Sequence, residues 1–159
     1  MGIIKGIINT LMTLIIIVGV TFLVLYVCGI VPYVVLSGSM EPTIETGSLC
    51  FINKHASFRD IKKKDIIAFR LSDGTMVTHR VVAVRSDGVQ TKGDHNQEID
   101  GTLTTWDNYV GKNIFWIPKV GKVVVAFQSP KGKIIGIAAV VVILVSGFLF
   151  GEEDRKKKY

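Results

Sequence analysis

The sequence predicts a mostly β fold, a small antiparallel and partly closed β domain carried on transmembrane helical anchors. Three observations carry this prediction. The 159 residues are 48% apolar and their mean hydropathy is +0.43, which is high for an ordinary soluble domain. A long stretch without charged side chains lies near each end of the chain. Between these stretches, short β-branched runs alternate with turn signals.

The first uncharged stretch predicts a transmembrane helix over 7–31, preceded by a short cytoplasmic N-terminus over 1–6. No Asp, Glu, Lys, Arg or His occurs from Gly6 to Met40. A helix over 7–31 would be ~37 Å long, which exceeds the ~30 Å hydrocarbon core of a bilayer. No Ala precedes Ala56, so the small-residue cleavage site of a signal peptide is missing and an uncleaved anchor is expected.

The second uncharged stretch predicts another transmembrane helix over 133–151, followed by a basic cytoplasmic tail over 152–159. Its run 134–151 would be ~27 Å long as a helix, near the lower limit for a span. An amphipathic core helix is the alternative, but the run has no polar face. Lys5 and the basic residues 155–158 flank the two spans, so the positive-inside rule places both ends in the cytoplasm. A multi-pass protein is therefore expected in the cell membrane, or in the endoplasmic reticulum membrane of a eukaryote, with residues 32–132 on the extracytoplasmic side.

The middle segment, 32–132, predicts one β domain. Asp73-Gly74 and Asp87-Gly88 are turn dipeptides that join neighbouring runs as hairpins. No helical period of useful length occurs in this segment. The expected strands cover 48–53, 65–71, 75–85, 88–92, 109–116 and 119–127.

Charge and cysteine content exclude several classes. The formal net charge is +6, but 32–132 carries 13 Lys and Arg against 10 Asp and Glu, and no basic stripe interleaved with aromatics occurs, so no nucleic-acid partner is expected. Cys28 and Cys50 are too few for a disulfide framework or a zinc site. We expect no cofactor and no metal. The sequence makes no prediction of oligomeric state.

Four residues of the middle segment could carry chemistry. Ser39 follows the first span closely, in a stretch that would otherwise read as a linker. In a strand over 75–85, His79 shares the apolar face with Val77 and Val81, where the alternative is a core histidine bonded to a backbone carbonyl. Asp94 and Asp100 lie in a Gly-Asp-rich segment that would otherwise be a solvated turn.

Serine, histidine and aspartate together provide what acyl transfer needs. A serine hydroxyl is a weak nucleophile until a base removes its proton, and neutral imidazole does this near pH 7. A carboxylate on the other ring nitrogen fixes the tautomer and stabilises the imidazolium. Periodicity alone does not show that these groups meet in space.

The motifs around these residues resemble those of the type I signal peptidases. Residues 37–44, SGSMEPTI, are similar to the nucleophile box of that family, and 64–69, KDIIAF, resemble the strand that follows it. THRVV at 78–82 resembles the general-base box, KGDHN at 92–96 the acidic box, and IPKVG at 117–121 the C-terminal part. The boxes occur in the family's order and the resemblance covers 34–124.

The resemblance implies a subtype and a set of roles. A histidine at the base position, where the usual bacterial enzymes have lysine, resembles the endoplasmic-reticulum type, which is also found in archaea and some Gram-positive bacteria. Ser39 would be the nucleophile and His79 the base. Either Asp94, the first choice, or Asp100 would hold the histidine. Ser37 would help the Ser39 backbone N–H to bind the oxyanion.

The remaining candidates and the expected partners follow from the same reading. His95 stands where the family often has Asn and leaves a second imidazole beside Asp94. His55 and the run 62–64 are expected to be solvated. Met40, Phe115 and Trp116 would either contact lipid headgroups or pack in the core.

The implied activity is that of a membrane-bound serine endopeptidase that removes N-terminal signal peptides from exported preproteins and cuts after small residues. Its partners would be signal-peptide-bearing preproteins and the lipid bilayer. One alternative is a non-catalytic membrane-anchored β interaction domain. A self-cleaving repressor-type peptidase is disfavoured, since those proteins are soluble and resemble a Ser-Lys pattern.

Overall fold

The computed structural model describes residues 2–156, and it describes no side chains at 2, 4, 5, 144 and 146–156. The chain divides into two compact units, Leu25–Val125 and Met1–Val24 with Ala126–Tyr159. The basic tail predicted over 152–159 lies outside the described side chains, as does Lys5. The elements, in chain order, are α1 (Gly2–Val27), β1 (Ile30–Val34), β2 (Leu49–Asn53), a 3-10 turn (Phe58–Asp60), β3 (Ile66–Arg70), β4 (Met76–Val84), β5 (Val89–Lys92), β6 (Tyr109–Ile117), α2 (Gly121–Gln128) and α3 (Pro130–Lys156).

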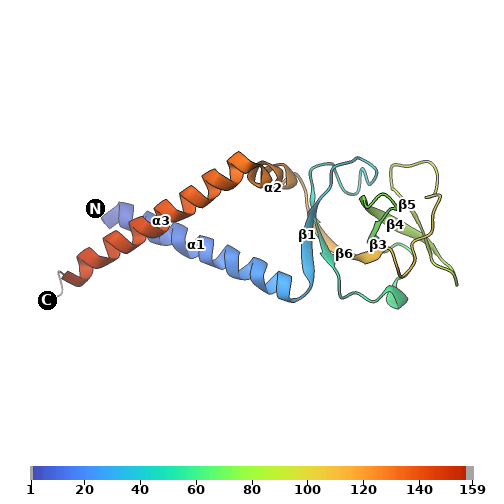
Figure 1. Ribbon diagram of the computed structural model, residues 1–159, viewed down its shortest axis with the longest axis horizontal. Helices are drawn as coiled ribbons and strands as arrows, with labels where there is room; N and C mark the ends of the chain where they lie inside the picture. Colours follow the sequence, from blue (N-terminus) through green and yellow to red (C-terminus); the bar gives the residue numbers. More distant parts are fainter. Residues whose placement is uncertain (1, 157–159) are drawn as a thin grey trace. The chain divides into compact units, whose positions relative to one another are not determined.

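The unit Leu25–Val125 contains one antiparallel six-stranded sheet (Figure 1). Its strand order is β1-β2-β6-β3-β4-β5. The hairpin turns predicted at Asp73-Gly74 and Asp87-Gly88 join β3 to β4 and β4 to β5. Among the described strands β1 and β5 are the two edges, so the sheet does not close. The antiparallel sheet is confirmed, and the partial closure expected from the sequence is not.

The core lies on both faces of β3, because successive side chains of a strand point to opposite faces. Ile66 and Ala68 belong to one buried cluster, with Met40 and Ile44 from the chain after β1. Ile67 and Phe69 belong to the other cluster, with Val81 of β4 and Val89 of β5. β3 is thus a central strand, which explains the continuous apolar run at 66–69.

The first strand, β1, was not predicted. The sequence predicts a helix over 7–31, but α1 ends at Val27. It ends there because Gly29 adopts φ +72 and its N–H donates to the Tyr26 carbonyl. This left-handed glycine is a common helix C-terminal device. The residues after it pair antiparallel with β2, from Ile30↔Asn53 to Val34↔Leu49. Pro32 is tolerated because β1 is an edge strand.

The strand predicted over 119–127 is wrong, since α2 occupies Gly121–Gln128. β6 ends at Ile117, and Lys119 then adopts a left-handed φ of 66. Gly121 lies against the Gly47 carbonyl, where an added Cβ would approach to 2.6 Å, and its N–H donates to that carbonyl. The valines at 123–125 favour a strand locally, but this contact turns the chain out of the sheet before they are reached.

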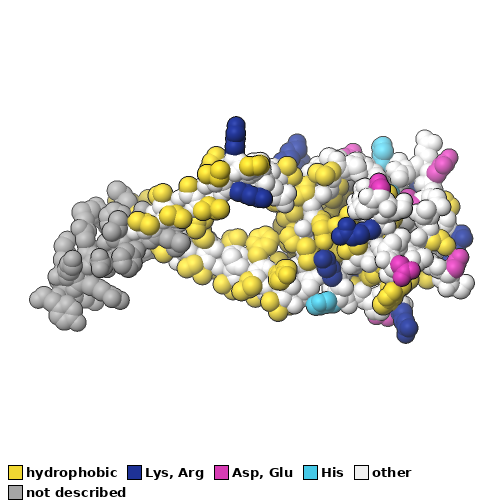
Figure 2. Space-filling view, viewed as in Figure 1, with side chains coloured by type: hydrophobic (Ala, Val, Ile, Leu, Met, Phe, Trp, Pro, Cys, Tyr) yellow, Lys and Arg dark blue, Asp and Glu magenta, His cyan; other side chains and the backbone are white. Residues whose placement is uncertain are grey.

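The helices at the two ends differ in how well they match a membrane span. Gly6–Val27 of α1 is long and apolar enough to cross a bilayer, and its surface in Figure 2 is mostly hydrophobic. Gly121–Gln128 and Pro130–Ile143 pass the same test only as a pair, and they are bent by 92°. Ser129 separates them: its hydroxyl accepts from the Gly132 N–H, and Pro130 begins α3, as expected for a helix N-terminus. Among the described residues one helix is therefore long and apolar enough to cross a bilayer, and a second candidate exists if the bent pair is taken as a single span.

Candidate active site

Ser39 lies in a tight turn between β1 and β2. The Glu41 N–H donates to the Gly38 carbonyl, and the Ile44 N–H donates to the Met40 carbonyl. Met40 and Ile44 are 1% and 0% exposed, so these two side chains anchor the turn to the core. Met40 therefore packs in the core and does not reach lipid. This anchoring fixes the backbone on the C-terminal side of the serine.

His79 lies in the middle of β4, opposite Ile67 of β3. It is 7% exposed, and its ring makes an edge contact with Phe69, with centroids 6.1 Å apart. This is the apolar face that the strand alternation predicts. A buried imidazole needs polar partners, and it finds them in side chains and not in a backbone carbonyl.

The two ring nitrogens of His79 each contact one of the predicted site residues. Nε2 lies 3.1 Å from Ser39 Oγ, and Nδ1 lies 2.7 Å from Asp100 Oδ2. With the Nδ1 proton donated to the carboxylate, Nε2 is free to accept the serine proton. Forty positions of sequence separate the serine from the histidine, and the sheet brings them into hydrogen-bond contact.

Asp94, the aspartate preferred from the sequence, does not contact His79 and pairs with Arg80 instead. Arg80 donates from Nε to Oδ1 at 2.8 Å and from Nη2 to Oδ2 at 2.6 Å. The Arg80 guanidinium lowers the pKa of Asp94 below its ordinary value, because paired donors stabilise the ionised form. The geometry thus distinguishes the two aspartates. Asp100 is hydrogen-bonded to the His79 imidazole, and Asp94 is hydrogen-bonded to Arg80, the next residue in β4.

A groove of about 510 Å³ opens beside the serine. Ser37 lies at this groove, and its Oγ is 3.3 Å from Ser39 Oγ. Two stretches of chain, 33–36 and 75–79, supply most of the residues that line the groove. Apolar side chains make up much of the lining, among them Val35, Cys50 and Met76. Burial raises the pKa of the Cys50 thiol to about 11, so this thiol is not a nucleophile at neutral pH.

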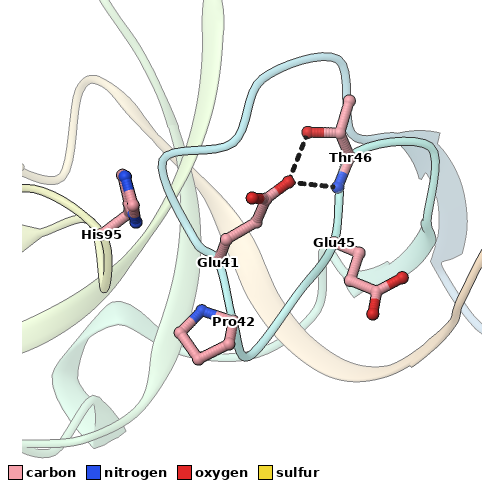
Figure 3. Close-up of a pocket in the computed structure, with 5 residues that line it drawn as sticks. All are labelled: Glu41, Pro42, Glu45, Thr46 and His95. Carbon is pink, nitrogen blue, oxygen red and sulfur yellow. Dashed lines mark hydrogen bonds between the residues drawn. The ribbon is translucent and has the colours of Figure 1, made fainter.

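A second pocket, of about 450 Å³, lies beside the same turn (Figure 3). Glu41 points toward Thr46, which donates to Oε1 from its hydroxyl at 2.8 Å and from its backbone N–H at 3.2 Å. These bonds lower the pKa of Glu41. His95 lines this pocket and not the groove, so the second imidazole beside Asp94 is separate from Ser39's side chain. Its backbone N–H, however, donates to the Ser39 carbonyl at 2.9 Å.

The other sequence candidates are not among the residues that line the groove beside Ser39. His55 is exposed on the surface and its ring lies against Gly29. The three lysines at 62–64 are exposed, as predicted. Phe115 and Trp116 are 41% and 37% exposed, and Phe115 stacks on Phe51 with centroids 4.2 Å apart. No group of three or more His, Cys, Asp or Glu is arranged to hold a metal ion in the part of the chain that the structure describes.

Sequence reasoning missed two residues that contact the predicted ones. Arg80, which strand alternation puts on the face of β4 opposite to His79, forms an ion pair with Asp94. Thr91, in β5, donates to Asp100 Oδ2 at 2.6 Å. A threonine in a short strand is an ordinary β residue. Its burial next to a carboxylate is visible only in three dimensions.

Comparison with known proteins agrees with this geometry. The model of the family described as "Signal peptidase, peptidase S26" matches residues 7–113. Signal peptidase I W of Bacillus subtilis is 38% identical over 78 residues, which cover 46% of this chain and 41% of that protein. The signal peptidase complex catalytic subunit SEC11 of Colletotrichum graminicola is 31% identical over 126 residues, 70% of this chain and 73% of that protein. The SEC11 subunit of Leptosphaeria maculans is 32% identical over 128 residues, with the same two shares.

The family match covers well over half of the chain, and it includes the serine and the histidine that lie in contact. It decides against the alternative of a non-catalytic interaction domain. The resemblance found in the sequence motifs is thereby confirmed. The chain belongs to the signal peptidase family, peptidase S26, and is a serine peptidase of the kind that removes signal peptides at a membrane.

Proposed function

We propose that Ser39, His79 and Asp100 form the catalytic triad of this peptidase. The observation that carries the proposal is the continuous contact from Ser39 Oγ through both ring nitrogens of His79 to Asp100 Oδ2, at 3.1 and 2.7 Å. Both distances are within the reach required for proton transfer. Asp94 is a positioning residue in this proposal, since it contacts Arg80 and not the imidazole.

The reaction follows from these contacts. Ser39 Oγ attacks the carbonyl carbon of the scissile peptide bond while His79 Nε2 takes the hydroxyl proton. Asp100 stabilises the imidazolium that forms. The tetrahedral intermediate then expels the amine of the mature protein, which receives the proton from His79. A water molecule, deprotonated by His79, hydrolyses the ester on Ser39 and releases the signal peptide.

The oxyanion of the tetrahedral intermediate needs donors beside the nucleophile. We assign this role to the Ser39 backbone N–H and the Ser37 hydroxyl, which lies 3.3 Å from Ser39 Oγ. Loss of one such donor costs about 2.7–4 kcal/mol of transition-state stabilisation in other serine hydrolases.

The groove supports a preference for an extended substrate with small side chains. Stretches 33–36 and 75–79 line it, so a substrate strand could bond to exposed main chain while alternate side chains enter the groove. We propose that the residues one and three positions before the cut are small, because the side chains of Met40, Cys50 and Met76 line the groove and take up space there.

We also propose how the chain is arranged in the membrane, beyond the presence of one apolar helix. In this arrangement, α1 spans the bilayer from a cytoplasmic N-terminus, residues 32–132 lie on the extracytoplasmic side, and α3 returns the chain toward the cytoplasm. The supports are the apolar run Gly6–Val27, the 134–151 run without charges, and the basic residues outside both. The substrates are then preproteins whose signal peptides lie in the same bilayer.

The experiment is cleavage of a preprotein reporter by purified full-length chain in detergent. Wild type should release the mature protein, and Ser39→Ala should release none above background. Ser72→Ala, in the exposed β3–β4 turn, is the matched control and should be as active as wild type. Normal cleavage by Ser39→Ala would overturn the proposal.

A further inference from the structure

Asp100 accepts a second hydrogen bond that the reaction above does not use. Thr91 Oγ1 donates to Oδ2 of Asp100 at 2.6 Å, and this is the same oxygen that lies 2.7 Å from His79 Nδ1. The two residues are also joined through their backbones, because the Asp100 N–H donates to the Thr91 carbonyl at 2.9 Å. Thr91 is 0% exposed, so water does not compete for its hydroxyl.

The two residues sit on parts of the fold that differ in rigidity. Asp100 lies in the irregular chain between β5 and β6, where side chains are ordinarily the most mobile. Thr91 lies inside β5, paired with Val81 of β4, the strand that also carries His79. The Thr91 hydroxyl therefore ties the Asp100 carboxylate to the β4–β5 strand pair, and β4 also positions the His79 imidazole.

Two donors on one carboxylate oxygen fix the rotation of that carboxylate. With only the His79 bond, Asp100 could turn about its Cβ–Cγ bond and present either oxygen to the imidazole. With Thr91 bound as well, one oxygen is held where it faces Nδ1. Catalytic groups need this kind of support, because a small displacement of a positioned group costs much of its effect.

We propose that Thr91 is a positioning residue of the catalytic site, which orients the Asp100 carboxylate toward His79. This inference rests on the proposed function, since it needs Asp100 to act on the imidazole. Thr91 itself touches neither the serine nor the groove.

A buried threonine hydroxyl could instead serve only the stability of the fold, since most buried polar groups are paired. The chain contains a control for this. Thr104 is also 0% exposed, and its Oγ1 is buried without a hydrogen-bond partner among the described residues. Thr104→Val removes a buried hydroxyl and keeps the side-chain shape, as Thr91→Val does, but it removes no contact with the site.

The test measures kcat and KM of full-length variants on a preprotein reporter. Without the hydroxyl the Asp100 carboxylate is free to rotate away from the imidazole, so Thr91→Val should lower kcat by about ten-fold or more, with KM changed by less than about two-fold. Thr104→Val should keep both parameters at the wild-type level. Thr91→Ser should restore most of kcat, whereas Thr91→Ala should be as slow as Thr91→Val.

The Ser and Ala variants keep the test decisive if Thr91→Val does not fold. Both lose the same methyl group and differ only in the hydroxyl, so their ratio of kcat reports the hydrogen bond alone. A further check is Thr91→Val in an Asp100→Asn background. There the additional loss should be less than about two-fold, because the hydroxyl acts through the carboxylate.

Equal kcat values for Thr91→Ser and Thr91→Ala, or a wild-type kcat for folded Thr91→Val, would overturn the inference. An undiminished extra loss in the Asp100→Asn background would also overturn it. Failure of the proposed function gives a different result, which is wild-type activity in Asp100→Asn or Ser39→Ala. Loss of activity in those two variants with full activity in Thr91→Val would overturn this inference and leave the proposed triad in place.

Discussion

Two aspartates six positions apart differ sharply in their surroundings. Asp100 Oδ2 is hydrogen-bonded to His79 and Thr91, whereas the two oxygens of Asp94 accept from Nε and Nη2 of Arg80. The sequence identifies the segment and both residues, but the Gly-Asp motif favours Asp94. What decides between them is the direction in which the loop returns after β5, and no local pattern encodes it. Strand alternation, by contrast, predicts the apolar surroundings of His79 because it depends only on neighbouring residues.

The two aspartates should therefore respond differently to amidation. Asp100→Asn should lower kcat by about 10³–10⁴-fold, because the amide no longer selects the tautomer or stabilises the imidazolium. Asp94→Asn should lower kcat by no more than about ten-fold, since it acts on Arg80. The measurement is kcat on the preprotein reporter for each variant. A larger loss for Asp94→Asn than for Asp100→Asn would show that Asp94, the residue preferred from the sequence motif, is the partner of His79.

At the scale of elements, the loop after β5 and the turn that carries Ser39 are in direct contact. The His95 N–H donates to the Ser39 carbonyl, and a Cβ added at Gly93 would lie 2.5 Å from that same carbonyl oxygen. Position 93 therefore requires glycine, because its backbone lies so close to the Ser39 carbonyl. A larger residue would have to push this carbonyl away, and that would move the nucleophile.

Gly93→Ala should for this reason mainly lower kcat, with a smaller effect on the free energy of unfolding. We expect kcat to fall by about 10²-fold, the order caused by a displacement near 1 Å in an active site. Gly101→Ala is the matched control, because no atom lies within 4 Å of a Cβ added there. Wild-type kcat in folded Gly93→Ala would show that the two loops can separate without consequence.

The Arg80–Asp94 pair joins β4 to the same loop and should contribute a pH-dependent part of the stability. The folded pKa of Asp94 lies below the ordinary value, so its contribution is complete above that value and is lost as the pH falls through the lowered one. Asp94→Asn should reduce the free energy of unfolding at pH 7 by about 1 kcal/mol, the scale of a partly exposed ion pair. The difference from wild type should shrink below about pH 4.

Denaturant unfolding at pH 7 and pH 3 measures this difference. Asp87→Asn, at the exposed β4–β5 turn, is the control, because Asn-Gly is as good a turn as Asp-Gly. A deficit for Asp94→Asn that is equal at both pH values would contradict the linkage.

The sequence predicts five of the six strands to within two residues at each end. These strands are bounded by turn residues, and the hairpins are local. β1 was missed because its apolar residues continue the helix pattern, and only Gly29 and the pairing with β2 separate them. α2 was mistaken for a strand because the valines at 123–125 satisfy the strand pattern, while the contact of Gly121 with Gly47 is long-range. The errors fall where tertiary contact overrides local preference.

At the scale of the whole molecule, the chain combines a charge-poor helix with a charged β unit. The span Gly6–Val27 follows directly from composition. The second predicted span, 133–151, lies within α3, which begins at Pro130 after a bend of 92° from α2, and it stays a prediction. A hydropathy run gives length, and it does not give the place where a Ser-Pro pair starts a new helix.

The anchor should fail when a charge is placed inside it. Val18→Lys puts an ammonium group within Gly6–Val27, at an insertion cost of ~2.5–3.5 kcal/mol. The fraction of the protein that stays in the membrane after alkaline carbonate extraction should therefore fall. Val84→Lys is the matched control, since Val18 and Val84 are both 54% exposed but Val84 ends β4. Equal extraction of the two variants would show that α1 does not hold the chain in the bilayer.

The most direct measurement of the central claim is kcat/KM for Ser39→Ala, His79→Ala and the double variant on one preprotein reporter. If serine and imidazole act as one unit, each single variant should lose at least about 10³-fold, and the double variant should lose no more than the worse single one. His95→Ala should keep wild-type kcat/KM, since its imidazole lines the other pocket. Losses that multiply in the double variant, or a His79→Ala enzyme that retains wild-type kcat/KM, would contradict the account.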